Sequence, residues 1–294
     1  MGRAAVPSYT KAHGIDVVSS SALPMPPSEA EARPTHGAVP KEMTEQDIND
    51  FIGYYVQAAR NAIAAGFDGV EIHAANGYLI DQFTQDVVNK RTDTWGGSVE
   101  KRSRFALEIA KRCADAIGAD RVGIRLSPFS TFQGMKMEPQ RAREEQFGYL
   151  VRELRKLGLA YLHVVESRIQ GSADTEATAD RVDFMLDIWQ GKLSGGEGKP
   201  LEPNHGAVLI AGGFTPASAI RAVDEELVGR NVAIVFGRYW ISTPDLVYRV
   251  KHGIELTPYD RKTFYVPKER KGYCDYPFSK EFEREFGVRV QASM

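Results

Sequence analysis

The sequence predicts a parallel α/β fold, because short apolar runs alternate with amphipathic helices along most of the chain. Each run is rich in β-branched residues and is shorter than a buried helix would be. Five such runs are expected to be strands: 69–73, 122–126, 161–165, 207–211 and 232–236. Because a complete (β/α)₈ barrel has eight strands, five fit either an open sheet or a barrel of which part is absent.

The helices between these strands are recognised by their ends. Their starts carry a capping residue or a proline, and most of their ends carry a glycine. Starts are expected at Thr44, Ser98, Pro139, Thr215 and Thr243, and ends near Gly66, Gly118 and Gly158. Before them, a strand-like piece at 16–20 leads into a proline-rich connector at 23–27 and a polar loop that runs through Pro40.

Composition points to a globular protein that acts on a small molecule. The chain has 294 residues, 43% hydrophobic and 26% charged, and its 37 Lys and Arg nearly balance its 39 Asp and Glu. That balance argues against a nucleic-acid or anionic-membrane partner. Cys113 and Cys274 lie far apart in no metal or redox pattern, which indicates reduced thiols. With no transmembrane-length apolar run and no signal-peptide pattern, we expect a cytoplasmic protein.

Three polar side chains follow directly on the first predicted strand. They are His73, Asn76 and Tyr78, in the segment His-Ala-Ala-Asn-Gly-Tyr. Parallel α/β enzymes place their ligands at the carboxyl ends of strands, so we expect these side chains to face one cavity. The alternative is a core histidine beside an ordinary Asn-Gly turn.

Arg125 stands in the middle of the second predicted strand, within Gly-Ile-Arg-Leu-Ser. A buried charge is costly unless it is paired, so this guanidinium should meet an anion or a polarised ligand. The alternative is an internal salt bridge to a carboxylate such as Glu71 or Glu166.

Glycines follow the last two predicted strands. Gly212 and Gly213 end one, and Gly237 with Arg238 ends the other. Bare backbone amides at consecutive strand ends, together with a guanidinium, are typical of phosphate sites in barrels. The alternative is that both glycine motifs are only turns.

Taken together, these residues resemble the old yellow enzyme family of flavin-dependent ene-reductases, which includes plant oxophytodienoate reductases and fungal enzymes of ergot-alkaloid pathways. The resemblance runs along nearly the whole chain. Its motifs are Ala65–His73, Ala75–Leu79, Asp81–Phe83, Asn89–Asp93, Trp95–Ser98, Arg125–Pro128, Tyr161–His163, Gly212–Phe214, Phe236–Arg238, Pro244–Leu246, Tyr259–Arg261, Thr263–Tyr265, Gly272–Tyr273 and Asp275–Pro277.

The resemblance implies an FMN-containing barrel, with NADPH or NADH as the electron donor. His73 and Asn76 would donate hydrogen bonds to the carbonyl oxygen of an α,β-unsaturated substrate, and Tyr78 would protonate the α-carbon. Arg125 would balance the charge of the reduced flavin ring. The phosphate of FMN would be held by Gly212, Gly213, Gly237 and Arg238. The substrate side of the flavin would be lined by Tyr265.

The chain also departs from the family pattern. Its start, Met-Gly-Arg-Ala, resembles the stretch that follows the family's third barrel strand. We therefore expect one FMN-binding domain over 1–294 that is a (β/α)₈ TIM barrel truncated at the N-terminus, with about five of its eight strands. Such a truncation could reflect an incomplete gene model. A Gly/Pro-rich surface loop is expected at 191–206, and a C-terminal extension at 257–294.

The leading hypothesis is an FMN ene-reductase that acts as a monomer or homodimer. The main alternative is a truncated, inactive remnant of such an enzyme that no longer holds flavin. A third hypothesis, a barrel aldolase or metal enzyme, would need a Schiff-base lysine or a metal cluster at the strand ends. The sequence offers no obvious candidate apart from Glu71 and Glu166.

Overall fold

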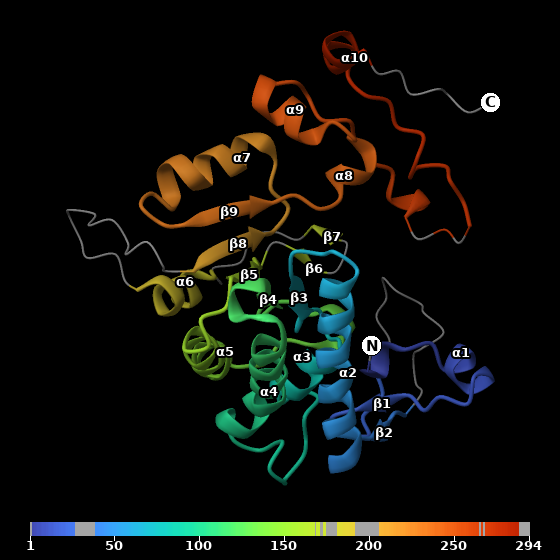
Figure 1. Ribbon diagram of the computed structural model, residues 1–294, viewed down its shortest axis with the longest axis vertical. Coiled ribbons are helices and arrows are strands. Elements are labelled where there is room, and N and C mark those ends of the chain that lie inside the picture. The colour runs from blue at the N-terminus through green and yellow to red at the C-terminus, as the bar shows by residue number, and fades with distance from the viewer. Residues whose placement is uncertain are drawn as a thin grey trace. The chain divides into compact units, whose positions relative to one another are not determined.

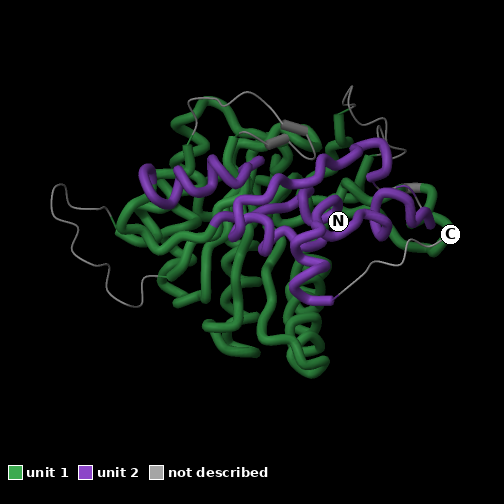
Figure 2. Tube along the Cα trace, turned by 90° about the horizontal axis from the view of Figure 1, so that it is seen from above, with its two compact units in different colours: residues 1–212, 227–233 green, residues 213–226, 234–294 purple. Residues whose placement is uncertain are grey.

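The computed structural model describes residues 2–26, 39–167, 169–170, 173–174, 181–191, 206–264, 266 and 268–287. The chain divides into two compact units, coloured separately in Figure 2. Unit 1 comprises residues 1–212 and 227–233, and unit 2 comprises residues 213–226 and 234–294. Most of the loop expected at 191–206 lies outside the described residues.

A five-stranded sheet forms the centre of the fold, and its spatial order is the order of the strands along the chain. The pairings β3–β4, β4–β5 and β5–β8 are all parallel. The strands are β3 (Val70–His73), β4 (Val122–Leu126), β5 (Tyr161–Val165), β8 (Ala207–Ala211) and β9 (Val232–Val235). All five predicted strands are confirmed, with ends that differ from the prediction by at most one residue.

Helices of unit 1 cover one face of this sheet (Figure 1). In order they are α2 (Glu45–Ala64), α4 (Val99–Ile117), α5 (Gln140–Arg155) and α6 (Asp183–Gln190), and each packs against the next. The starts of α2, α4 and α5 are those the sequence predicts, whereas α6 was not predicted. Thr44 accepts a hydrogen bond from the Asp47 N–H and Ser98 accepts one from the Lys101 N–H, which satisfies amides that a helix start leaves free.

The two faces of the sheet differ in chemistry because successive strand residues point to opposite sides. The residues buried under the helices are Ile72, Ile124, Leu126, Leu162, Val164, Val208 and Ile210. The opposite face carries the polar residues Glu71, His73, Arg125, Tyr161 and His163. We call these five residues the polar face. A parallel strand buried on both faces normally reads as a continuous apolar run, so polar residues here mark a functional surface.

The strand-like piece expected at 16–20 contains a short strand, and its parallel pairing with a second strand was not predicted. β1 (Val18–Ser19) pairs with β2 (Lys41–Glu42). It is preceded by the 3₁₀ turn η1 (Gly2–Ala4) and α1 (Pro7–Ala12).

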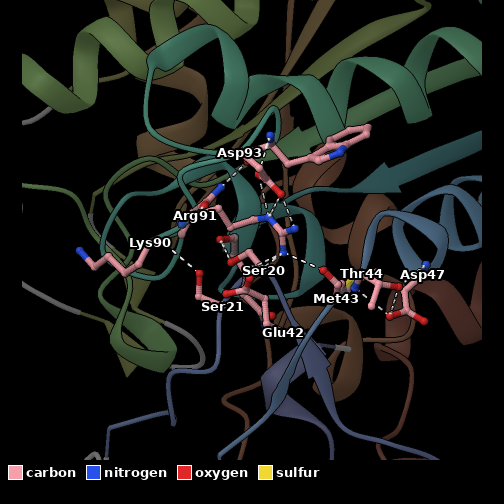
Figure 3. A network of polar contacts seen from close by, with 12 residues as sticks. Ser20, Ser21, Glu42, Met43, Thr44, Asp47, Lys90, Arg91 and Asp93 are labelled. Carbon is pink, nitrogen blue, oxygen red and sulfur yellow. Dashed lines mark hydrogen bonds and ion pairs between the residues drawn. The ribbon is translucent and has the colours of Figure 1, made fainter.

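Arg91 ties both of these strands to the loop that follows α3 (Leu79–Thr84) (Figure 3). Its guanidinium donates to the carbonyl oxygens of Ser20 at 3.0 Å and Met43 at 2.8 Å. It also pairs with Asp93 at 2.6 Å. The side chain is buried, and these partners satisfy the charge that burial would otherwise make costly.

Four short elements complete the described part of unit 1. They are the 3₁₀ turns η2 (Ala119–Arg121) and η3 (Phe132–Gly134), and the antiparallel pair β6 (Ile169–Gln170) and β7 (Ala173–Asp174).

Unit 2 contains the second half of β9 and a set of helices and turns. They are α7 (Pro216–Arg221), the π-helical turn η4 (Ala222–Glu226), α8 (Tyr239–Ser242), α9 (Leu246–His252), the 3₁₀ turn η5 (Arg261–Thr263) and α10 (Lys280–Phe286). The prediction of a helix start at Thr215 is confirmed by its capping box with Ser218.

The helix predicted to start at Thr243 instead begins at Leu246. The cause is the buried Asp245 carboxylate, which accepts hydrogen bonds from Arg249 Nε at 2.8 Å and from the Ser279 N–H at 2.8 Å. These contacts place Asp245 just outside the first helical turn. No helix in the described part of the chain is long and apolar enough to cross a membrane.

Candidate active site

The strand register brings the polar face together row by row. His73 on β3 pairs in register with Arg125 on β4, which pairs in turn with His163 on β5. One row earlier, Glu71 is opposite Gly123, and Gly123 is opposite Tyr161. Adjacent strands lie about 4.8 Å apart, so residues from three separate stretches of sequence form one surface.

The turn after β3 is held by backbone hydrogen bonds from both sides. The Ala74 N–H donates to the Arg125 carbonyl oxygen at 3.1 Å, and the Asn76 N–H donates to Ser127 Oγ at 2.7 Å. The Gly77 N–H donates to Asp81 Oδ2 at 2.8 Å. These three amides are therefore satisfied without using the side chain of Asn76.

Asn76 and Gly77 both have left-handed backbone conformations, with φ of 57° and 72°. Gly77 also has no room for a side chain, since a Cβ there would lie 2.8 Å from Gln133 Cβ and 2.9 Å from Met135 Cγ. Asparagine and glycine are the residues that adopt this conformation at least cost. The sharp turn brings the residue that follows it back toward His73.

His73 and Tyr78 meet at this turn. Their ring centroids lie 5.1 Å apart with the rings tilted by 53°. Tyr78 occupies the N-cap position of α3, but its side chain makes no capping hydrogen bond. The structure thus brings together His73, Asn76 and Tyr78 at the end of one strand, as the sequence predicts.

The charge state of His73 follows from its neighbours. One side of the ring is open to solvent, yet desolvation by the surrounding protein lowers the pKa of His73, and the positive charge of Arg125 lowers it further. Glu71 opposes both effects. The net direction favours a neutral imidazole at neutral pH, which donates one hydrogen bond and carries no charge.

Arg125 is half-buried in the middle of the polar face, and its Nε is buried without a hydrogen-bond partner among the described residues. Burial lowers the pKa of the guanidinium, and Glu71 acts against that. A buried N–H donor without a partner is costly, and an anionic or polarised ligand would satisfy it. This donor fits the electron-rich edge of a flavin ring.

Glu71, the salt-bridge partner considered for Arg125, has other close partners. Its carboxylate accepts a hydrogen bond from His163 Nδ1 at 2.9 Å. Arg125 and Glu71 therefore influence each other through their charges, while the carboxylate is bound by His163 of β5.

The phosphate-binding candidates are placed as follows. Gly212, at the end of unit 1, approaches Glu166 so closely that a Cβ would lie 2.6 Å from the Glu166 Cβ. In unit 2, Gly213 has φ of 66°, and a Cβ on Gly237 would meet no atom within 4 Å. Open space at Gly237 leaves room for a ligand group beside its backbone.

Arg238 follows directly as the N-cap residue of α8, and its guanidinium carbon lies 5.3 Å from the centre of the Tyr259 ring. This cation–π contact holds the charge near the strand end. Tyr265, the substrate-side candidate, lies outside the described residues.

Three residues of this region went unrecognised as part of the site. Ser127 binds the turn, Asp81 is the acceptor for Gly77, and His163 binds Glu71. Ser127 and His163 stand inside the motifs Arg-Leu-Ser-Pro and Tyr-Leu-His, so the signal was present. Among the described residues no group of three or more His, Cys, Asp or Glu side chains could hold a metal ion.

Comparison with known proteins places this geometry in a family. A model of the NADH:flavin oxidoreductase / NADH oxidase family matches residues 3–257. A chanoclavine-I aldehyde reductase of Penicillium roqueforti is 53% identical over 285 residues, which cover 97% of this chain and 70% of that protein. A probable inactive reductase of Epichloe festucae var. lolii is 46% identical over 289 residues, covering 97% and 70% of the two chains.

Solved structures agree with the sequence relatives. The Old Yellow Enzyme of Pichia sp. AKU4542 matches with a TM-score of 0.77 and 37% identity, over 94% of this chain and 67% of that one. The fold is therefore that of the Old Yellow Enzyme barrels, of which this chain contains the five-stranded part described above. The chain belongs to the NADH:flavin oxidoreductase / NADH oxidase family, the family of the Old Yellow Enzymes.

Proposed function

We propose that this chain is an FMN-dependent reductase that uses NAD(P)H to reduce the activated C=C bond of an α,β-unsaturated carbonyl compound. The observation that carries the proposal is the placement of His73, Asn76 and Tyr78 together at one turn. His73 is also the register partner of Arg125 on the neighbouring strand. When bound, FMN would supply the hydride for the β-carbon of the substrate.

The residues of the turn would polarise and protonate the substrate. A neutral His73 ring and the Asn76 amide each offer an N–H donor to the carbonyl oxygen, which draws electrons from the double bond. Tyr78, whose hydroxyl is not used to cap α3, would give its proton to the α-carbon. The proposed reaction needs two hydrogen-bond donors to the carbonyl oxygen and one acid for the α-carbon, and these three residues would supply them.

Arg125 and the strand-end glycines would hold the cofactor. The buried Arg125 Nε would donate to the flavin ring and favour its negatively charged reduced form. Gly212, Gly213, Gly237 and Arg238 remain the candidates for the phosphate of FMN. FMN is preferred to FAD because the sequence has no Gly-x-Gly-x-x-Gly dinucleotide turn.

The relative from Penicillium roqueforti is named for an aldehyde substrate, which favours an unsaturated aldehyde over a ketone as the substrate of this chain. A second candidate function, an inactive remnant, is favoured by the relatives named as probable inactive enzymes. The two functions differ in whether purified protein carries flavin.

Substitution of Tyr78 by Phe tests the proposed role of its hydroxyl. In flavin-loaded protein, Tyr78→Phe should lower the turnover of a weakly activated enal by roughly 100-fold, the usual worth of a positioned general acid. Reduction of the flavin by NAD(P)H, measured by stopped-flow absorbance, should keep the parent rate. An unchanged enal turnover would mean that water or another acid supplies the proton.

The flavin itself is the second test. Heat release followed by chromatography should yield FMN from the purified protein, in a flavin-to-protein ratio near one. Recovery of FAD would contradict the proposed cofactor, and protein that stays colourless after incubation with FMN would establish the inactive remnant.

A further inference from the structure

Glu71 is the only carboxylate on the polar face, as defined above, and it is held from the far side of β4. Its carboxylate accepts a hydrogen bond from His163 Nδ1 on β5 at 2.9 Å. Strands β3 and β5 are not neighbours, and two strand spacings separate them by about 10 Å. This hydrogen bond therefore passes over β4.

Gly123 makes this crossing possible. It lies between Glu71 and Tyr161 in the register, and a Cβ there would lie 2.3 Å from the Tyr161 ring. With no side chain at this position, the far end of the Tyr161 ring lies over β4. Burial, followed by the interaction with Glu71, raises the pKa of Tyr161 to about 12, so the phenol stays protonated.

The partners of Glu71 fix its charge. Partial burial alone would raise the pKa of Glu71, but hydrogen bonding and charge from His163, followed by the charge of Arg125, bring it below its usual range. Glu71 is thus ionised at neutral pH and only accepts hydrogen bonds, which assigns the proton of His163 to Nδ1.

Arg125 is the fixed cation nearest to Glu71 in the register. It lies one strand over and two residues further along on the same face, the diagonal position that a long side chain can reach. The other titratable groups facing Glu71 are His73, Tyr161 and His163. The adjoining face of β8 contributes Ala207, Leu209 and Ala211, which carry no charge.

We propose that Glu71 is a positioning residue, the counter-ion of Arg125, and that His163 holds it in place across β4, where the Tyr161 ring packs over Gly123. The carboxylate offsets part of the positive charge that Arg125 presents on the polar face. A residue that makes no contact with the reacting atoms thereby sets how strongly this face stabilises a bound anion.

The inference rests on the proposed function in one respect, namely that the anion is the reduced ring of FMN. Removal of the Glu71 charge then leaves Arg125 more positive toward the flavin and favours the reduced state. The midpoint potential should rise, in the direction opposite to the effect of removing Arg125.

The first experiment needs no flavin. The Glu71 carboxyl carbon is titrated by ¹³C NMR in the full chain, in Arg125→Met and in Arg112→Met. Arg112 lies on α4 and pairs with Glu108, so its substitution is the matched control. Arg125→Met should raise the pKa of Glu71 by roughly one unit, and Arg112→Met should leave it unchanged. An unchanged pKa in Arg125→Met overturns the proposal.

The second experiment measures the midpoint potential of bound FMN. Glu71→Gln keeps the shape of the side chain and removes its charge, and Glu108→Gln is the control. A tenfold shift toward the reduced flavin corresponds to about 30 mV for a two-electron couple, and this is the rise expected for Glu71→Gln alone. The proposal is overturned if Arg125→Met lowers the potential while Glu71→Gln leaves it unchanged.

The two experiments separate this inference from the proposed function. Protein that holds no FMN contradicts the proposed function, and the carboxyl titration then decides the counter-ion by itself. If Arg125→Met fails to fold, Arg125→Gln replaces it in the titration. Loss of the Arg125 charge should likewise raise the pKa of Glu71, and no rise would overturn the proposal.

Discussion

At the scale of single residues, Asn76 combines two demands. Its backbone must take the left-handed conformation that brings Tyr78 near His73, and its amide is the proposed donor to the substrate. Glycine would satisfy the first demand and alanine neither, because a Cβ is strained at positive φ. The choice of residue therefore reflects both backbone and chemistry.

We predict that Asn76→Ala destabilises the protein by about 1 kcal/mol relative to Asn76→Gly, the cost of a left-handed conformation for a residue with a Cβ. The measurement is the urea midpoint of each variant. Asn49, exposed within the helix α2, is the control, since there Ala should be the more stable substitution. The same order of stability at both positions would contradict a strained Asn76.

Asp81 is fully buried, and burial raises its pKa from 3.8 to about 7 despite hydrogen bonds from Gln85 and Gly77. Between these two values the folded chain binds a proton that the unfolded chain has lost. Stability from this group is therefore greatest at low pH and falls as the pH rises through about 7. The cause is the burial of the ionised carboxylate, which its hydrogen bonds only partly offset.

Replacement of Asp81 by Asn should weaken that pH dependence. The parent should lose unfolding free energy between pH 5 and pH 8, and Asp81→Asn should lose less, because the amide does not ionise. Urea unfolding at the two pH values measures the difference. An equal loss in both proteins would show that Asp81 is already ionised at pH 5.

At the scale of elements, β4 depends on a glycine. Gly123→Ala should destabilise the protein by about 1–3 kcal/mol, the usual cost of overpacking, since its Cβ would collide with the Tyr161 ring. Gly53→Ala is the control, because Gly53 lies inside α2 with no atom within 4 Å of a new Cβ. There alanine should stabilise by about 0.5–1 kcal/mol. Both effects are measurable by chemical denaturation.

The elements that the sequence predicts are those with local signals. Thr44 and Ser98 mark the starts of their helices in the sequence, because capping hydrogen bonds join residues that are three positions apart. The pairing of β1 with β2 involves only two residues from each strand. The two strands lie far apart in the sequence, and no periodicity marks the pairing. The start of α9 was misplaced because Ser279, distant in sequence, binds Asp245.

The candidate site divides in the same way. His73, Asn76 and Tyr78 lie within six residues, so their meeting follows from one strand and one turn. The pair of Glu71 and His163 depends on the order and register of three strands, which no local pattern contains. The pair follows from the strand order, in which β4 lies between β3 and β5.

At the scale of the whole molecule, cofactor binding should appear as stability. A ligand that binds only the folded state adds about 2.7 kcal/mol at a concentration 100 times its Kd. We predict that FMN raises the Tm of the chain more than riboflavin does, since only FMN has the phosphate proposed to meet Arg238. In Arg238→Met the two flavins should act alike, as differential scanning fluorimetry would show. A Tm that FMN does not change would favour the inactive remnant.

The strand order of the sheet bears on how the chain is made. Each of the pairings from β3 to β8 closes a loop of between about 40 and 50 residues. Within this sheet, each new strand pairs with the sheet strand that precedes it in the chain. Closure entropies for such loops differ by only about 0.3 kcal/mol, so no step is much harder than another. A nascent chain leaving the ribosome can dock β4 on β3 and β5 on β4 in turn, without waiting for a distant partner still to be translated.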